Sequence, residues 1–315
     1  METAIEKASP LALDEAPPLS LRRLIWLRFK RHKMALVGAV ILVLLVLYST
    51  IGAAFYSEAY ANSTDTGMSL QPPSTEHPFG TDVIGRDILA RTIYGGQISL
   101  MIGILAVLVQ VVAGVLIGAI AGYYGSWIDS LLMRFTEAVF NIPQLPLLLV
   151  LGKMLSDKVP TIKLLGRTFS GSVLVIICVL GLTSWMSLAR IVRANFLSLK
   201  EQEFVTAARC TGARNASIIF EHILPNTVAP IIVTATLGVA AAIINEAYVS
   251  FLGVGVLPPT ATWGNMLTGA YSHIERAPWL WIFPGSLIVL TVLSINFVGD
   301  GLRDALDPRA LVETE

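Results

Sequence analysis

Histidines and sequence motifs that bind metals or nucleotides are the first features that could indicate chemistry. Its four histidines are His32, His77, His222 and His273. None forms the His-Glu-x-x-His pair that places two imidazoles on one zinc ion, and no Gly-x-Ser-x-Gly sequence is present. The Gly152-Lys153 pair is followed by Met154, where a phosphate-binding loop requires Ser or Thr. We therefore predict that the chain is not an enzyme and holds neither a metal nor a nucleotide.

Glu246 is an ionisable residue at the outer end of a long apolar segment, with no cation nearby in the sequence. A carboxyl group in the membrane is costly to bury, so such a residue is a candidate ion or proton site. The same group could instead be a protonated or hydrogen-bonded packing residue. Both interpretations stay open, and Glu246 is kept as a pathway candidate.

The elements that must position these residues are long apolar segments. The chain is 54% hydrophobic and 14% charged, with a mean hydropathy of +0.70, whereas soluble chains are about one quarter charged. A helix needs about 20 mostly apolar residues to cross a bilayer. Six segments approach or exceed that length: Met34–Tyr56, Ile98–Gly122, Trp127–Gly152, Gly171–Ala189, Thr227–Asn245 and Trp279–Gly299. We predict an all-α polytopic membrane protein with about six transmembrane helices, five or seven being the neighbouring counts.

The distribution of basic residues predicts the orientation. Seven Lys or Arg residues precede the first span, six of them within Arg22–Lys33, which places the N-terminus in the cytoplasm by the positive-inside rule. An even number of spans returns the C-terminus to the same side. One loop, Ser156–Ser170, should be external yet carries three basic residues. The bias over the whole chain outweighs a single loop, so the assignment stands.

The spans and loops divide the chain into successive regions. A cytoplasmic tail with a basic pre-membrane segment precedes the first transmembrane helix and an extracytoplasmic segment. A five-helix core follows, with a cytoplasmic coupling loop and a short cytoplasmic C-terminal tail. The corresponding ranges are 1–33, 34–56, 57–97, 98–301 with its loop 193–226, and 302–315. The basic stretch Leu21–Lys33 is either a helix along the membrane surface or only a charge cluster that stops transfer.

Glycines and prolines mark special points in the spans. Gly114, Gly118 and Gly122 recur every four residues, a spacing that lets helices approach closely. Pro143 and Pro146 interrupt the third span, which indicates either a translocation pathway or a structural kink. Before the second span, Asp87 is expected to cap a short amphipathic helix, Ile88–Tyr94, on the outer membrane face.

The cytoplasmic loop between the fourth and fifth spans carries the clearest functional pattern. We expect one short helix through Ala207 and Ala208, ended at Gly212 by a left-handed backbone conformation. A second helix, Asn215–His222, then leads into the next span. Small side chains would let the first helix enter a groove of a partner, with Phe204 as an aromatic anchor.

This loop resembles the coupling motif of bacterial ABC-importer permeases, Glu-Ala-Ala, three residues, Gly, nine residues, Ile, one residue, Leu-Pro. Thr206 stands where the family has Glu, and His222 stands where it has Ile. The loss of the Glu puts in doubt any contact that this carboxylate would make to an ATPase. The resemblance places the motif on Thr206, Ala207, Ala208, Gly212, His222, Leu224 and Pro225, and with Glu203 and Phe204 these are the residues predicted for the ATPase-coupling loop.

Further sequences in order along the chain resemble the dipeptide and oligopeptide branch of this family, specifically the second of its two paired permeases. They are Phe79-Gly-Thr-Asp82, Gly85-Arg-Asp87, Ser250-Phe-Leu-Gly253, Pro258-Pro259, Trp263-Gly264 and Gly299-Asp-Gly-Leu-Arg-Asp-Ala-Leu-Asp-Pro308. The resemblance covers residues 20 to 310 approximately.

The resemblance implies the permease subunit of an ATP-driven importer in the bacterial inner membrane. Its partners would be a second homologous permease, two cytoplasmic ATPases that bind ATP and Mg²⁺, an extracytoplasmic solute-binding protein and membrane lipid, but no nucleic acid. Peptides are the implied cargo, and nickel or another small solute is the nearest alternative. A gradient-driven secondary transporter or a membrane scaffold is less favoured, because no inverted repeat is evident.

Overall fold

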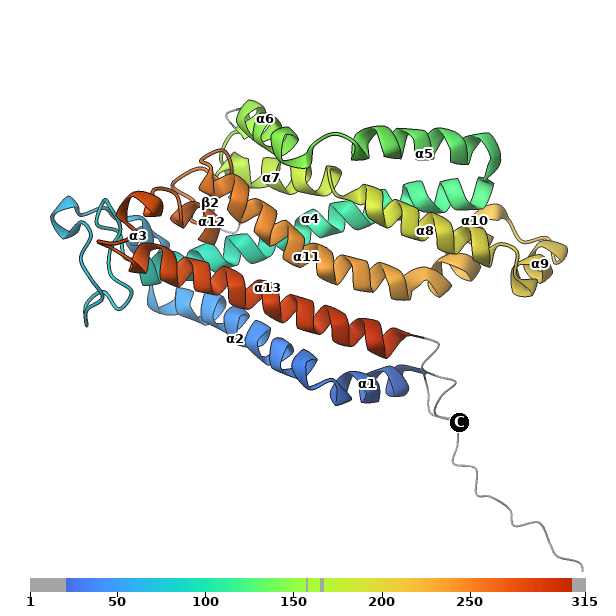
Figure 1. Cartoon of the computed structure of the whole chain (residues 1–315), viewed down its shortest axis with the longest axis horizontal. Helices are drawn as coiled ribbons and strands as arrows, with labels where there is room; N and C mark the ends of the chain where they lie inside the picture. Colours follow the sequence, from blue (N-terminus) through green and yellow to red (C-terminus); the bar gives the residue numbers. More distant parts are fainter. Residues whose placement is uncertain (1–20, 157, 165–166, 308–315) are drawn as a thin grey trace, which may run out of the picture.

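The computed structural model describes residues 21–156, 158–164 and 167–307. Long helices run side by side along the long axis of the molecule (Figure 1). They are α2 (Lys33–Phe55), α4 (Ile88–Tyr124), α5 (Ser126–Phe140), α7 (Gly171–Leu182), α8 (Trp185–Leu199), α11 (Val228–Phe251) and α13 (Trp279–Leu306), whereas α6 (Gln144–Ser156) is bent away from the direction of α5. The shorter elements are α1 (Leu21–Arg31), α3 (Glu58–Asn62), η1 (Thr66–Met68), β1 (Ile162–Leu164), β2 (Arg167–Phe169), α9 (Glu203–Cys210), α10 (Asn215–Ser217), η2 (Ile218–Ile223), η3 (Leu224–Thr227), α12 (Trp263–Met266) and η4 (Ala270–His273).

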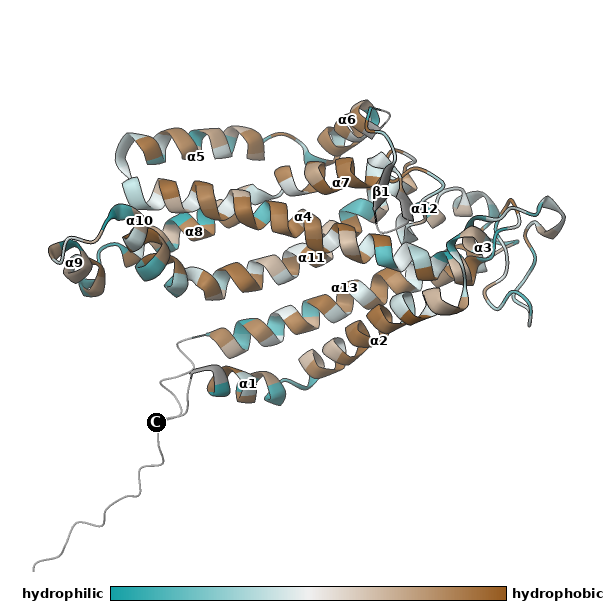
Figure 2. Ribbon diagram, turned by 180° about the vertical axis from the view of Figure 1, so that it is seen from behind, coloured by the Kyte–Doolittle hydropathy of each residue, from teal (hydrophilic) through white to brown (hydrophobic). Residues whose placement is uncertain are grey.

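The predicted fold class is confirmed. Over the described residues, five helical stretches are long and apolar enough to cross a membrane, and the pair α5 and α6 makes a sixth if it is one span bent by 81°. Apolar residues predominate along these helices, and hydrophilic residues gather at the two ends (Figure 2). The departure from an all-helical chain is a short antiparallel hairpin in which Ile162 pairs with Phe169.

The second span is longer than the sequence predicts. Helix α4 is continuous over 37 residues, about 55 Å at 1.5 Å per residue. The separate surface helix expected over Ile88–Tyr94 is therefore wrong, because these residues form the first turns of α4. The predicted cap is confirmed, since the Asp87 side chain accepts a hydrogen bond of 2.7 Å from the Ala90 amide.

Two further spans are interrupted rather than straight. Helices α5 and α6 meet at an angle of 81°, with Pro143 between them. Helices α7 and α8 are separated by Thr183 and Ser184, whose backbone is non-helical. The loop expected from residue 193 starts later, because α8 continues through Leu199.

Helix α4 lies at the centre and packs against α2, α7, α8 and α11. Close approach to α8 depends on the three glycines spaced four residues apart. A Cβ atom at Gly118 would lie 2.5 Å from the Ala189 carbonyl oxygen, and one at Gly122 would lie 2.5 Å from Phe196 Cβ. At Gly114 the nearest atom, Leu188 Cβ, would be 3.0 Å away. Larger side chains would therefore push the two helices apart.

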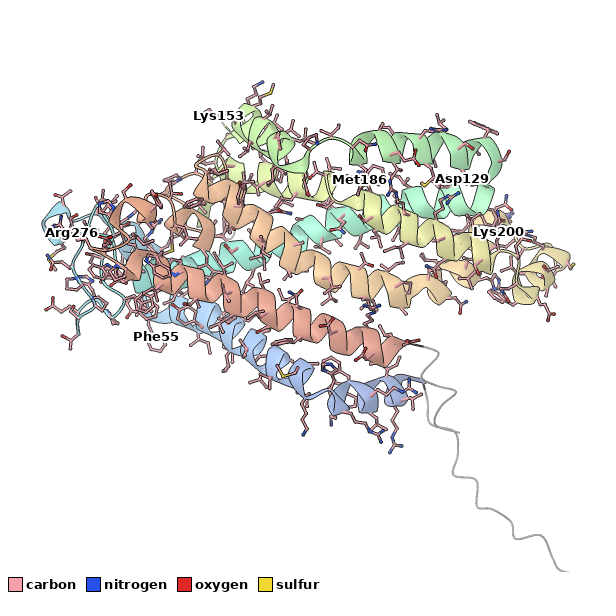
Figure 3. All side chains as sticks on the ribbon, viewed as in Figure 1. Phe55, Asp129, Lys153, Met186, Lys200 and Arg276 are labelled. Atoms are coloured by element: carbon pink, nitrogen blue, oxygen red, sulfur yellow. The ribbon has the colours of Figure 1, made fainter. Side chains whose placement is uncertain are left out.

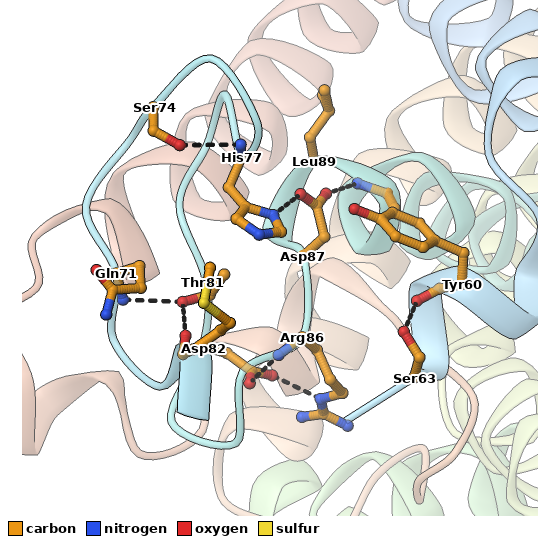
Figure 4. Close-up of polar contacts among 12 residues, drawn as sticks. Tyr60, Ser63, Gln71, Ser74, His77, Thr81, Asp82, Arg86, Asp87 and Leu89 are labelled. Carbon is orange, nitrogen blue, oxygen red and sulfur yellow. Dashed lines mark hydrogen bonds and ion pairs between the residues drawn. The ribbon is translucent and has the colours of Figure 1, made fainter. Parts of the chain in front are cut away.

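The segment between α2 and α4 folds into a compact set of turns (Figure 4). Arg86 pairs with Asp82 at 2.6 Å, and the His77 ring contacts the Asp87 carboxylate at 2.8 Å. The Trp279 indole donates a hydrogen bond of 3.1 Å to the Thr81 carbonyl. These contacts fix the segment on the start of α13, at the end of the molecule opposite α1 and α9 (Figure 1).

Candidate functional site

A cavity of about 640 Å³ lies where the two interrupted spans face α4 and α11. That volume is within the range of small-ligand sites, about 300–1,000 Å³. The residues lining it are Gln110, Val139, Phe140, Asn141, Ile142, Pro143, Gln144, Leu147, Thr183, Ser184, Met186, Ser187, Thr234, Leu237, Gly238, Ala241, Ala242 and Asn245. In Figure 3 the labelled Met186 marks its position in the middle of the molecule, on α8.

Both helix breaks open onto this cavity. Asn141 and Pro143 belong to the break between α5 and α6, and Thr183 and Ser184 to the break between α7 and α8. The Gln144 amide approaches the Ser184 hydroxyl at 3.4 Å and so links the two breaks. Interrupted helices are tolerated at membrane depth where they line a polar cavity. The breaks thus deliver polar groups to the middle of the bundle.

The polar groups that line the cavity are neutral. Gln110, Asn141, Gln144 and Asn245 supply amides, which can both donate and accept hydrogen bonds, and the hydroxyl groups come from Thr183, Ser184, Ser187 and Thr234. Gly238 leaves room for the Gln110 side chain, since an added Cβ would lie 3.1 Å from its Oε1. None of the described lining residues is ionisable. The cavity can therefore hold polar groups of a solute without fixing a charge.

The three pathway candidates from the sequence are placed differently. Pro143 lines the cavity, whereas Pro146 is exposed on α6 and Glu246 lies outside it. Glu246, on α11, is completely buried and contacts α4 through Ser99. Its carboxylate accepts hydrogen bonds from Ser250 at 2.7 Å and from Ser99 at 3.2 Å. The same two hydroxyls accept the backbone amides of Val256 and Trp263.

Glu246 thereby sits at the centre of a buried polar network. The network attaches Val256, in the segment between α11 and α12, to α11, and Trp263, the first residue of α12, to α4. A buried carboxylate with two hydroxyl donors and two backbone amides behind them is satisfied as a structural group. This geometry favours the packing interpretation over an ion site that is open to the pathway.

The predicted coupling helix is α9, at the end of the molecule near α1 (Figure 1). Ala208 faces inward, 8% exposed, and joins Val205 in a core cluster with α8 and η2. Ala208 is therefore a packing residue of this chain rather than a contact for a partner. The exposed face of α9 carries Phe204, Thr206 and Ala207, with Glu203 also exposed at its start.

Gly212 ends α9 with a left-handed backbone, φ = +82°. Its amide bonds to the Arg209 carbonyl, and the Ala213 amide bonds to the Ala208 carbonyl, both at 3.0 Å. This pair of bonds is the Schellman motif, which favours glycine at the left-handed position. An added Cβ would meet no atom within 4 Å, so the requirement comes from the backbone and not from space.

The Leu224-Pro225 pair does not form a corner between the loop and α11. The chain stays helical from α10 through η2 and η3 into α11, and Leu224 has helical dihedral angles. Pro225 stands in the first turn of η3, where a missing amide is tolerated. His222 is half-buried and Leu224 packs against the core cluster beneath α9, while Pro225 is exposed. The segment is a helical extension of α11.

Two contacts near α9 were not predicted. Arg193 on α8 forms a bidentate pair with Asp129 on α5, with Nη2 at 2.6 Å from Oδ2. Tyr123, near the end of α4, donates a 2.8 Å hydrogen bond to Asn215, and the Arg209 guanidinium lies 5.9 Å from its ring centre. These contacts tie α5 to α8, and α4 to α9 and α10.

Apart from Pro143, the cavity residues were not predicted from the sequence, where the pathway candidates were an ionisable group and prolines. Amide and hydroxyl side chains within apolar segments could have indicated the cavity, because each polar group in the membrane needs a partner. Gln110 and Asn245 are such residues in the second and fifth spans. Only the packing of the helices shows that they meet.

Two family models match the chain. Residues 114–312 match the binding-protein-dependent transport system inner membrane component, and residues 20–73 match the N-terminal transmembrane domain of oligopeptide transport permease C. Together they span the start of the membrane region and nearly all of the helical core.

Several named proteins are similar over most of their length. A dipeptide transport system permease, DppC of Alkalihalophilus pseudofirmus, is 40% identical over 96% of this chain and 95% of its own. A putative peptide permease of Brucella suis is 43% identical over 90% and 89% of the two chains. The oligopeptide permease OppC of Bacillus subtilis is 39% identical over 92% and 90%.

A crystal structure of an amino acid ABC transporter with histidines matches with a TM-score of 0.46 and 19% identity, over 67% of this chain and 92% of that one. The family model covers well over half of the chain, and the named relatives share about two residues in five with it. The chain therefore belongs to the family of binding-protein-dependent transport system inner membrane components, as a multi-pass permease of the ABC-transporter type.

Proposed function

We propose that this chain is a permease subunit of an ATP-driven importer of di- or oligopeptides, and that its central cavity is part of the translocation pathway. The observation that carries the proposal is the set of neutral amides and hydroxyls gathered at two helix breaks. A peptide bond presents one donor and one acceptor, which such groups complement without binding one charge state tightly. The names of the relatives, dipeptide and oligopeptide permeases, support the same cargo.

The proposal includes separate partners for energy and delivery. Two cytoplasmic ATPases would carry ATP and Mg²⁺ and receive the exposed face of α9, while a second permease would complete the pathway. A solute-binding protein would deliver the peptide at the end formed by residues 57–87. Closure of the ATPases would shift the permeases between outward-facing and inward-facing states. The shift follows because the ATPases would bind ATP with different affinity in these two states of the assembly.

Uptake of a labelled dipeptide by cells that lack the native gene and carry the cloned chain tests the cavity. Asn245→Leu replaces a lining amide with a side chain of similar size, and we expect about tenfold slower uptake, since one lost hydrogen bond to a substrate is worth about 1.5 kcal/mol. Uptake of labelled nickel under the same conditions distinguishes the alternative cargo. Nickel uptake without peptide uptake would overturn the peptide assignment.

A matched pair of threonines on α11 provides the control. Thr234 and Thr236 both bond their hydroxyl to the carbonyl four residues back, at 2.8 and 2.9 Å, but only Thr234 lines the cavity. Thr234→Val should slow peptide uptake, whereas Thr236→Val should not. Equal effects of the two changes would show that the helix, rather than the cavity, was perturbed.

A further inference from the structure

Helix α1 presents one strongly basic, partly apolar face to its surroundings. Arg23, Trp26, Leu27 and Lys30 follow the i, i+3, i+4, i+7 spacing of one helix face, and Arg31 adjoins them. We call these five residues the basic face of α1. Trp26 is 54% exposed and Leu27 is 41% exposed. The face thus combines cations with uncovered apolar surface.

The opposite side of α1 fixes its orientation. Phe29 is buried together with Ala35 and Ala305, and Ile25 packs against the same cluster. The Arg28 guanidinium donates to the Asp307 carbonyl at 3.4 Å. These contacts hold α1 against the last turns of α13. The basic face is therefore directed away from α13.

The charges of this face are not neutralised within the described part of the chain. Among the described carboxylates, Asp304 on α13 approaches His32 at 3.7 Å, and Asp307 follows the last residue of α13. Among the described residues, neither Arg23, Lys30 nor Arg31 has a carboxylate within 4 Å. The Lys30 ammonium lies 5.0 Å from the centre of the Trp26 ring.

The place of α1 along the chain determines what this face meets. His32 separates α1 from α2 and caps the latter, so an apolar span begins directly after the basic helix. A Trp beside cations at the end of a span lies at the level of the lipid headgroups. Anionic headgroups complement unpaired Lys and Arg there, each cation contributing about 1 kcal/mol.

We propose that the basic face of α1 binds the phosphates of anionic phospholipids, with Lys30 and Arg31 nearest the headgroups and Trp26 and Leu27 at the acyl boundary. The proposal does not depend on the cargo or on which leaflet holds this end. An acidic segment of a partner protein would use the same cations but would give the face no preference among lipids.

The full-length chain in vesicles of phosphatidylcholine tests this by electron spin resonance. Spin-labelled phosphatidylglycerol and spin-labelled phosphatidylcholine are compared for the fraction immobilised on the protein. We expect several-fold tighter association of phosphatidylglycerol, weakened by added salt. The triple variant R23Q/K30Q/R31Q should lose most of that preference, and the charge-preserving R23K/K30R/R31K should keep it.

A second triple variant, K153Q/K158Q/R276Q, removes the same charge from exposed residues away from α1, and Lys153 and Arg276 are labelled at the opposite end in Figure 3. It should retain the preference for phosphatidylglycerol. An unchanged preference after R23Q/K30Q/R31Q, an equal loss in both glutamine variants, or no preference in the unmodified chain would each overturn the proposal.

Discussion

The carboxyl group of Glu246 accepts hydrogen bonds from two hydroxyls in a fully buried site. Replacing it distinguishes a role in packing from a role as an ion site. Glu246→Gln keeps the shape and one acceptor, so we expect a small loss of thermal stability and near-normal peptide uptake. Glu246→Ala leaves Ser99 and Ser250 without their partner and should cost about 1–3 kcal/mol. Thermal unfolding and uptake are measured for both variants. Abolished uptake by a stable Gln variant would restore the ion-site interpretation.

Gly212 allows a second residue-scale prediction, because its left-handed backbone is needed while the space around it is open. Gly212→Val should strain the end of α9 by about 1–2 kcal/mol, leave membrane insertion intact and reduce transport per ATP hydrolysed. Gly212→Asn is the control, since Asn adopts this conformation more readily. Insertion is assayed by membrane fractionation, and coupling by the ratio of uptake to hydrolysis. Normal coupling in the Val variant would contradict the assignment of α9.

At the scale of elements, the Asp129–Arg193 pair ties α5 to α8 beside the end of α4. Both side chains are partly accessible, 15% and 33% exposed, so solvent screens part of their attraction. We expect a coupling energy of about 1 kcal/mol in a double-mutant cycle of D129N, R193Q and the double variant. Additive losses of thermal stability would show that α5 is held by its apolar contacts alone.

The predictability of the elements follows from the length of the pattern that specifies each one. An uncharged run such as Met34–Tyr56 determines a span with little ambiguity, and α2 occupies nearly the same residues. Asp87 was correctly expected to start a helix, but no local signal distinguishes a short helix from the first turns of α4. Pro225 does not break the helical path into α11, because the first turn of a helix tolerates proline.

The candidate site was less predictable because its members are distant in the sequence and meet only through packing. Gln110 and Asn245 lie on different spans, and the break at Ser184 contains neither proline nor a charged residue to announce it. The small residues of the loop suggested a surface for a partner. The structure instead divides them, with Ala207 exposed and Ala208 buried in the chain's own core.

For the whole molecule, the arrangement of the ends gives a test of orientation. Helix α1, the end of α13 and helix α9 lie together at one end, and residues 57–87 lie at the other (Figure 1). The basic residues around α1 predict that the first end lies in the cytoplasm. Cys210 is exposed on α9 and Glu76 is exposed in the segment between α2 and α4, so these two positions report opposite sides of the membrane.

In a chain carrying Cys178→Ala, a membrane-impermeant maleimide applied to spheroplasts should leave Cys210 unlabelled until the membrane is permeabilised. With Cys210→Ala added, Glu76→Cys should react without permeabilisation. Both reporters are needed, because an ATPase bound to α9 would also shield Cys210 from the maleimide. Such an ATPase would not affect Glu76→Cys, which would still react from outside. Labelling of Cys210 in intact spheroplasts together with protection of Glu76→Cys would reverse the orientation, and with it the assignment of α9 as the end that meets the ATPases.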